Sequence, residues 1–271
     1  MPAFEVMGVV NVTPDSFSDG GEWFDRDAAV RHGLELAAAG AAILDVGGES
    51  TRPGADPVPE AEELRRVLPV IEELAARLPD TTLSVDTTKA AVAAAAIDAG
   101  ARYVNDVTGL RGDPEMLALV AERDVRCCLM HMRGEPRTMQ RDPVYDDVVA
   151  EVRVFLEERL AVARTAGVRA ERIDLDPGVG FGKTVEHNLA LLRRLDEIVA
   201  IGPRVLVGTS RKSFLGRLTG RDDPRQRLAG TIATNVLALA AGARVFRVHD
   251  AGAIRDALAV AARVLDPDDA V

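Results

Sequence analysis

Short apolar stretches alternate with longer amphipathic ones along the 271-residue chain. Eight of the short stretches are rich in Val, Ile and Leu, as the buried strands of a parallel sheet are. The predicted strands are Val6–Asn11, Ala42–Val46, Leu83–Asp86, Tyr103–Val107, Arg126–His131, Ile173–Asp176, Val205–Gly208 and Val245–His249. Between them, apolar residues recur every three or four positions, which predicts helices. The predicted helices are Asp27–Ala39, Pro59–Leu78, Lys89–Ala99, Glu115–Arg123, Tyr145–Ala166, Glu186–Val199, Arg225–Ala241 and Ala253–Leu265.

Strands that alternate with helices imply a parallel sheet. Eight such units in 271 residues fit a (β/α)8 TIM barrel, whose typical length is about 250 residues. A doubly wound open sheet is the alternative, but it usually has fewer strands and binds its ligand at one crevice. Polar residues follow nearly every predicted strand, which favours a ring. We therefore expect a single α/β domain over residues 1–271, with its active site at the C-terminal ends of the strands.

Two groups of polar residues at these strand ends have a chemical interpretation. The first group consists of Asp86, Asn105, Asp176 and Lys212. Its carboxylates can accept from N–H donors, its amide can serve a ligand edge that has both a donor and an acceptor, and its ammonium can donate to a carbonyl oxygen. Together these groups match the donors and acceptors along the edges of a flat heterocycle, so the set predicts a site for such a ligand. Because buried polar groups cost free energy unless they are matched, the site should discriminate strongly among ligands. Each residue also has a structural interpretation, since a carboxylate after a strand can cap the next helix.

The second group lies where the last strand of a barrel meets the first. Asn11, Arg247 and His249 occupy these ends and predict an anion site, since phosphate sites in such barrels are common near strands seven and eight. The sequence has no P-loop motif, no nucleophile elbow and no His-rich zinc pattern.

Composition narrows the class further. A net charge of −10 without arginine–aromatic interleaving argues against nucleic-acid binding. No apolar run approaches the ~20 residues that span a bilayer, and the first residues do not resemble a signal peptide. A cytoplasmic protein without a membrane partner is expected. The adjacent Cys127 and Cys128 point to opposite faces of a strand, so we expect buried structural cysteines that form no mutual disulfide.

Lysine is rare in this chain. Of 33 basic residues only Lys89, Lys183 and Lys212 are lysines, and each is a candidate for a place where arginine cannot replace a compact ammonium. Lys89 lies close to Asp86 in the sequence, but the favoured explanation is that it simply solvates the start of the third helix. The sequence leaves open whether Lys89 and Lys183 have functional roles.

A series of motifs, one on nearly every predicted strand, resembles one known family. They are NVTPDSFSDGG at 11–21, Asp45–Ala55 (DVGGESTRPGA), Ser84–Thr87 (SVDT), Asn105–Val107 (NDV), Leu129–Met132 (LMHM), Asp176–Lys183 (DPGVGFGK), Ser210–Ser213 (SRKS) and Arg247–Asp250 (RVHD). In this order, from residue 6 to about residue 265, the chain resembles the monofunctional dihydropteroate synthases of folate biosynthesis. The resemblance implies that 6-hydroxymethyl-7,8-dihydropterin pyrophosphate reacts with p-aminobenzoate to give 7,8-dihydropteroate and pyrophosphate.

The same resemblance implies roles for individual residues. The pterin would be held by Asp86, Asn105, Asp176 and Lys212. The pyrophosphate, with Mg2+ as cofactor, would be met by Asn11, Phe181, Arg247 and His249. The metal would bind at Asn11, with Asp19 in or beside that site. The p-aminobenzoate pocket would be shaped by Phe17, Thr51, Arg52, Pro53 and Ser213. The catalytic set would be Asn11, Asp19, Lys212, Arg247 and His249. Family members are commonly dimers, so a homodimer is expected.

The expected mechanism is a dissociative substitution without a covalent enzyme intermediate, since pyrophosphate leaves readily once its charge is matched. Residues Thr13–Gly21 are expected to form a cover that orders over the bound substrates. Three alternatives remain at this point. They are a pterin-binding methyltransferase barrel, a Schiff-base aldolase with Lys212 as nucleophile, and a non-catalytic pterin-binding paralogue.

Overall fold

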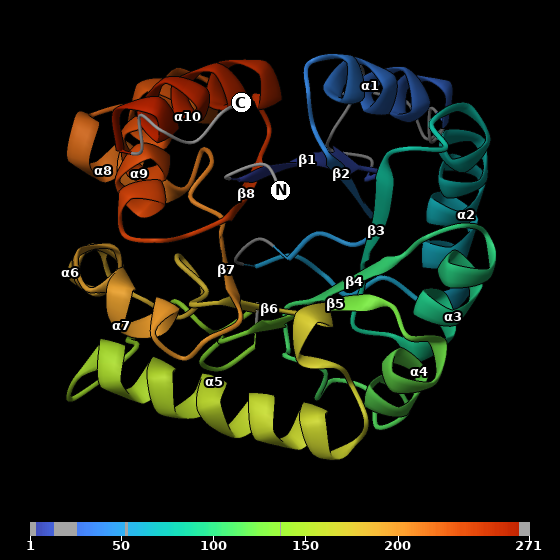
Figure 1. Cartoon of the computed structure of the whole chain (residues 1–271), viewed down its shortest axis with the longest axis horizontal. Helices are drawn as coiled ribbons and strands as arrows, with labels where there is room; N and C mark the ends of the chain where they lie inside the picture. The colour runs from blue at the N-terminus through green and yellow to red at the C-terminus, as the bar shows by residue number, and fades with distance from the viewer. Residues whose placement is uncertain (1–3, 14–25, 52–53, 136, 266–271) are drawn as a thin grey trace.

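Eight parallel strands close into a barrel in the order β1 to β8, and helices surround it in a computed structural model of the chain (Figure 1). The structure describes residues 4–13, 26–51, 54–135 and 137–265. The strands are β1 (Glu5–Asn11), β2 (Ile43–Gly47), β3 (Thr82–Asp86), β4 (Tyr103–Asp106), β5 (Arg126–Met130), β6 (Ile173–Asp176), β7 (Arg204–Val207) and β8 (Val245–Val248). Every predicted strand forms, with ends displaced by at most one residue. The predicted TIM barrel is confirmed.

Helices follow the strands around the ring. They are α1 (Arg26–Ala38), α2 (Glu60–Arg77), α3 (Ala90–Asp98), α4 (Met116–Arg123), α5 (Val148–Thr165), α6 (Val185–Arg193), α7 (Leu195–Val199), α8 (Ser213–Thr219), α9 (Leu228–Ala240) and α10 (Ala251–Leu265), with 3-10 turns η2 (Ala170–Arg172) and η3 (Pro224–Arg227). The short α8, which begins directly after Lys212, was not predicted because its seven residues are too few for a clear period.

The helix predicted over 186–199 is wrong in one respect, since it breaks at Arg194. The backbone of Arg194 leaves the helical region, with φ −113° and ψ 31°, and separates α6 from α7. Its guanidinium donates to both carboxylate oxygens of Asp147 at 3.0 Å and to Glu197 at 2.7 Å. Arg194 thereby ties α7 to the N-terminus of α5, a long-range contact that the local pattern does not contain.

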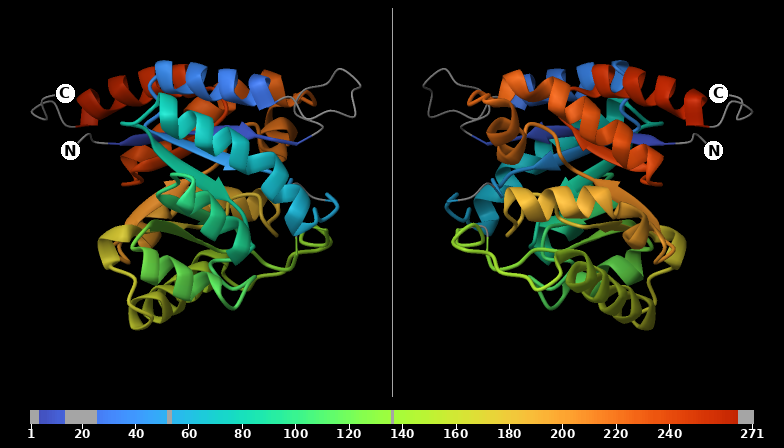
Figure 2. Two further views of the ribbon diagram at one scale, coloured as in Figure 1. Left: turned by 90° about the vertical axis from the view of Figure 1, so that its right-hand side faces the viewer. Right: turned by 90° about the vertical axis from the view of Figure 1, so that its left-hand side faces the viewer.

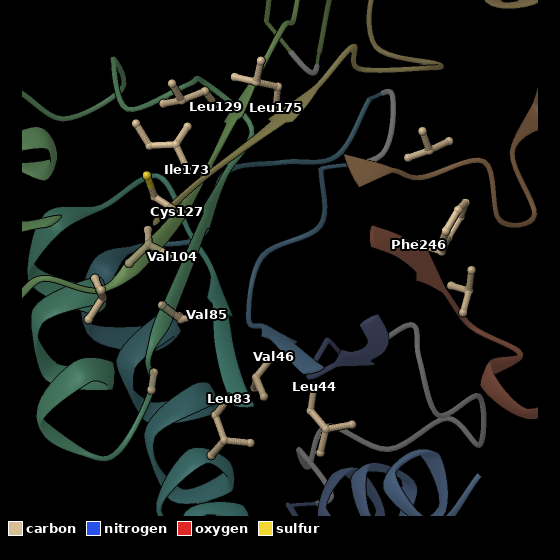
Figure 3. Close-up of a cluster of buried hydrophobic side chains, with 14 of the residues drawn as sticks. Leu44, Val46, Leu83, Val85, Val104, Cys127, Leu129, Ile173, Leu175 and Phe246 are labelled. Carbon is tan, nitrogen blue, oxygen red and sulfur yellow. The ribbon is translucent and has the colours of Figure 1, made fainter. Parts of the chain in front are cut away.

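Alternating residues on the strands build two separate apolar layers. The outer layer packs the strands against the helices, and Figure 3 shows part of it, including Leu44, Val85 and Cys127. The inner layer fills the barrel and contains Cys128 and Tyr103. Both cysteines are buried and free, and they belong to different layers. This confirms that they point to opposite faces of β5.

A charged network lies across the N-terminal end of the barrel. The buried Asp174 accepts hydrogen bonds from Tyr103 Oη at 2.8 Å, Arg126 at 2.9 Å and Arg204 Nε at 2.9 Å. Glu5, the first residue of β1, pairs with the same two arginines at 3.1 and 3.0 Å. All these residues stand at or near the start of their strands, so their side chains bridge that end of the ring. The other end carries the predicted site.

The start of β1 and the end of α10 lie at one end of the molecule, and the described parts of the segment 133–145 and of the loop after β2 extend at the opposite end (Figure 2). Because all eight strands are parallel, that opposite end carries their C-terminal residues. No helix in the described part of the chain has the length and apolar character needed to cross a membrane.

Candidate active site

The strand register brings the predicted heterocycle-binding residues to one level of the barrel. Asp86 pairs with Asn105 across β3 and β4, and Met130 pairs with Asp176 across β5 and β6. Asp86, Asn105 and Asp176 are all buried, and all stand at or next to the C-terminal ends of their strands. The glycine opposite Asp86 on β2 matters because a Cβ there would lie 3.3 Å from Asp86 Cβ. The structure therefore gathers these three side chains in the barrel mouth.

Asp45 is the centre of this polar network, and sequence reasoning did not identify it as a site residue. Its fully buried carboxylate accepts from Ser84 Oγ at 2.6 Å, Asn105 Nδ2 at 2.9 Å and Arg247 Nε at 2.6 Å. Arg247 Nη2 also donates to Asp86 at 2.7 Å. The available signal was a carboxylate inside the apolar strand β2, where an unpaired charge is costly. Asp45 thus links the predicted heterocycle set to the predicted anion set.

Burial changes the acid–base properties of the carboxylates. It raises the pKa of Asp86 to about 7, with Arg247 opposing the change and Asp45 adding to it. The pKa of Asp176 is also raised, first by burial, while Lys212 favours its ionised form. The ionisation of Asp86 is therefore sensitive to the charges of Arg247 and Asp45 beside it.

Lys212, directly before α8, extends its ammonium towards the barrel. The ammonium donates to Val179 O and lies 4.6 Å from the centroid of the Phe181 ring. Burial lowers the pKa of Lys212 to about 8, and Asp176 partly opposes this effect. Lys212 and Asp176, both predicted for the pterin, thus interact electrostatically, and Phe181, predicted for the pyrophosphate, lies against the same ammonium.

The glycine-rich segment after β6 is locked against the end of β5. Gly178 has φ +66°, and a Cβ there would lie 1.8 Å from His131 O, so glycine is required. The buried Lys183 lies 3.0 Å from His131 Nδ1 and donates to Phe181 O at 3.0 Å. Burial lowers the pKa of Lys183 to about 7 and, with the nearby Lys183 charge, that of His131 to about 3. Lys183 therefore holds the segment that carries Phe181.

The predicted anion residues lie on neighbouring strands. Asn11 ends β1, and β8 pairs alongside it with Arg247 opposite Met7. His249 follows β8, and its Nδ1 lies 2.9 Å from Ser210 Oγ, which also accepts from the His249 backbone N–H at 3.1 Å. These contacts fix the imidazole next to the loop after β7. The three residues share the C-terminal end of the barrel, as predicted.

The remaining predicted residues are less fully placed. Thr51 follows β2 and is partly buried, and Ser213 begins α8 with an exposed side chain. Phe17, Asp19 and the pair Arg52–Pro53 lie outside the described residues. Their predicted roles stay predictions.

A closed parallel barrel with buried carboxylates, an amide and two cations at its C-terminal end defines a class. This is a TIM-barrel enzyme that recognises a polar small molecule. A family model described as "Pterin binding enzyme" matches residues 7–249. Dihydropteroate synthase from Synechocystis sp. is 47% identical over 256 residues, spanning 94% of this chain and 88% of that protein.

Solved structures of dihydropteroate synthases are also similar to this chain. The Xanthomonas albilineans dihydropteroate synthase with 4-aminobenzoic acid has a TM-score of 0.91 and 52% identity, covering 97% of this chain and 93% of that one. The same enzyme in complex with 7,8-dihydropteroate has a TM-score of 0.87 and 49% identity, covering 97% and 94%. The chain belongs to the dihydropteroate synthase family of pterin-binding enzymes.

Proposed function

We propose that the chain joins 6-hydroxymethyl-7,8-dihydropterin pyrophosphate to p-aminobenzoate, giving 7,8-dihydropteroate and pyrophosphate for folate biosynthesis. The observation that carries this proposal is the convergence of Asp86, Asn105, Asp176 and Lys212 in the barrel mouth, next to Arg247. Membership of the dihydropteroate synthase family supports it, as do related structures whose names include 4-aminobenzoic acid and 7,8-dihydropteroate.

Pterin recognition follows from the chemistry of the four side chains. Asp86 and Asp176 accept hydrogen bonds from the amino group and ring N–H of the heterocycle, Asn105 serves a mixed edge, and the Lys212 ammonium donates to the carbonyl oxygen. Asp86, Asn105 and Asp176 are buried, so a ligand that leaves them unpaired loses their solvation without compensation. A heterocycle lacking this donor and acceptor pattern is therefore rejected.

The chemical step is a substitution at the pterin methylene carbon. Its C–O bond breaks, the electron pair leaves with pyrophosphate, and the dihydropterin ring delocalises the positive charge. Ionised Asp86 and Asp176 stabilise that charge, while Asn11, Arg247 and His249 meet the departing anion. The neutral amine of p-aminobenzoate then forms the new C–N bond and releases a proton to solvent, so it needs positioning more than deprotonation.

Magnesium is the proposed cofactor. Among the described residues, no group of three or more His, Cys, Asp or Glu side chains could hold a metal ion, so this part of the chain offers no all-protein cage. Mg2+ commonly keeps several waters and takes one or two protein oxygens plus substrate phosphates. The Asn11 amide oxygen fits that limited role, with Asp19 as the second proposed group. Bound there, Mg2+ would neutralise part of the pyrophosphate charge.

The p-aminobenzoate site completes the proposal. Thr51 lies in the loop between β2 and α2, Ser213 begins α8 after the loop that follows β7, and Phe17, Arg52 and Pro53 are the other proposed contacts. Closure of the segment around Phe17 over the pterin would exclude water from the reacting carbon.

Pyrophosphate release tests the proposal directly. The purified protein is mixed with the pterin pyrophosphate, and release is followed on adding p-aminobenzoate, with and without Mg2+. We expect continued release over many turnovers to require both substrates, to match the amount of dihydropteroate formed, and to fall when EDTA removes Mg2+. Turnover of both substrates without formation of dihydropteroate would contradict the proposed reaction, and a pterin–protein adduct trapped during turnover would contradict the dissociative substitution.

A homodimer is also part of the proposal. Four large aliphatic side chains are exposed on the adjacent helices α9 and α10, namely Leu237, Val260, Val264 and Leu265, and a group of exposed apolar side chains favours a self-interface. Sedimentation velocity of the wild type and of Val260→Asp tests this. A dimer weakened by the substitution is expected, and a monomeric wild type would overturn it.

A further inference from the structure

Beside the proposed site, one lysine holds two carboxylates from different elements. Lys89 precedes α3 and stands three residues after Asp86. Its Nζ lies 2.5 Å from Glu49 Oε2, in the loop after β2, and 2.5 Å from Glu63 Oε2, on α2. The expected alternative, a lysine that only solvates the start of a helix, is therefore wrong for Lys89. The three residues form a cluster that we call the Lys89 clasp.

The clasp is anchored by a buried charge. Glu63 is fully buried, and its second oxygen, Oε1, has no hydrogen-bond partner in the described part of the chain. Taking a carboxylate out of water is costly unless a cation compensates it. Lys89 supplies that cation, so its ammonium is held firmly against α2 and is available to fix Glu49.

Glu49 in turn joins the two ends of one loop. Its Oε2 accepts from Lys89 and also from the backbone N–H of Val58 at 3.3 Å, so one oxygen links the start of the 50–57 loop to its end. The preceding residue, Gly48, packs against α2, the helix that carries Glu63, since a Cβ on Gly48 would lie 2.9 Å from Val67 Cγ1. Arg66 donates to Gly48 O at 2.8 Å. The base of this loop is thus tied to α2 and α3.

We propose that Lys89 is a positioning residue for p-aminobenzoate. Acting through Glu49, it fixes the base of the loop that carries Thr51, two residues further on, and so sets the shape of the p-aminobenzoate pocket without touching the pterin. This inference rests on the proposed function, in which Thr51 contacts p-aminobenzoate.

The choice of lysine agrees with this role. All three lysines of the chain lie at the C-terminal end of the barrel, and each contacts more than one acceptor or ring. An ammonium is a compact charge with three rotatable donors, which suits two carboxylates arriving from different directions. Arginines in this structure also bridge two carboxylates, as Arg247 does with Asp45 and Asp86, so what distinguishes lysine here is the compactness of its ammonium and not the number of its partners.

The test separates the two substrates. Glu49→Ala removes the clasp from the loop while leaving Lys89 paired with Glu63. We expect KM for p-aminobenzoate to rise about tenfold, as for loss of a charge-assisted hydrogen bond, with KM for the pterin pyrophosphate unchanged within about twofold. Glu49→Gln keeps an acceptor oxygen and should give an intermediate KM. Arg153→Met, which breaks an exposed ion pair with Glu157 on α5, is the matched control and should change neither KM.

A second variant addresses folding. Lys89→Met alone would strand the buried Glu63 charge, so it is combined with Glu63→Gln, and the double variant should show the same KM split as Glu49→Ala. Hydrogen exchange of the Val58 amide gives a readout independent of catalysis, and exchange should accelerate in both variants and stay unchanged in Arg153→Met. Equal changes in both KM values, or unchanged Val58 exchange, would overturn the inference. A wild type that makes no dihydropteroate would refute the proposed function. In that case, exchange of the Val58 amide would still test whether the Lys89 clasp fixes the base of the loop.

Discussion

Replacing Asp45 by Asn removes one negative charge from the centre of the barrel mouth while keeping the shape of the side chain. The remaining amide oxygen can still accept from Arg247 and Asn105. Ser84 can turn its hydroxyl to accept from the new amide, since a hydroxyl both donates and accepts. Asp45→Asn is therefore close to a pure charge deletion at a site where four side chains converge.

The expected cost follows from the contacts of Arg247. Removing one partner of a buried ion pair costs about 3–5 kcal/mol. Arg247 keeps Asp86 at 2.7 Å, and its side chain is 25% exposed, so water and the second carboxylate recover part of the loss. We expect the free energy of unfolding to fall by about 2 kcal/mol. This is less than the roughly 5–15 kcal/mol of a typical protein, so the variant stays folded.

The functional effect is expected in the pH profile. Burial raises the pKa of Asp86 to about 7, and the Asp45 charge contributes to that increase. In Asp45→Asn the negative charge that raises the pKa of Asp86 is gone, while the Arg247 cation that lowers it remains. The pKa of Asp86 should therefore fall. Because the ionised carboxylate stabilises the cationic transition state, the acid limb of the kcat profile should lie near pH 7 in the wild type. In Asp45→Asn it should move to lower pH.

Stopped-time assays of dihydropteroate formation between pH 5 and pH 9 measure this shift. The matched control is Asp174→Asn, the same substitution in the ion network at the opposite end of the barrel. It should reduce stability and leave the acid limb in place. If the acid limb of Asp45→Asn is unchanged or moves to higher pH, the Asp45 charge does not raise the pKa of Asp86, although both carboxylates contact Arg247.

Three further outcomes are expected. Gly178→Ala should abolish activity and lower Tm, because a Cβ there meets a carbonyl oxygen at 1.8 Å, whereas Gly54→Ala, with φ +86° and open space, should be milder in thermal melts. Burial lowers the pKa of Lys183 to about 7, so the folded protein binds fewer protons than the unfolded chain between pH 7 and about 10. The advantage of wild type over Lys183→Met in urea unfolding should therefore grow by about 2 kcal/mol from pH 7 to pH 9, and a constant difference would contradict this. Lys212→Ala should weaken pterin binding in calorimetry, while Phe17→Ala should spare it and raise KM for p-aminobenzoate, and equal effects on both substrates would argue against that division.

The positions of Asp86, Asn105 and Asp176 could be predicted from the sequence because each stands at or next to the end of a strand that is recognisable locally. A buried parallel strand needs an apolar run, and a following helix needs its own period, so strand ends are visible without any tertiary information. Parallel alternation then places all those ends on one side of the sheet. The motifs added the family, and with it the expected substrates.

The ion-pair partners of the site residues, in contrast, depend on closure of the barrel. Asp45 looked like an interior strand residue, yet it meets Arg247 from 202 positions away once β8 closes on β1. Lys89 looked like a helix start, yet it bridges Glu49 and Glu63 across 40 and 26 positions. Local periodicity determines which side chains face inward, since it depends only on the neighbouring backbone. Which buried charges neutralise one another depends on register and ring closure, so only the tertiary structure could decide it.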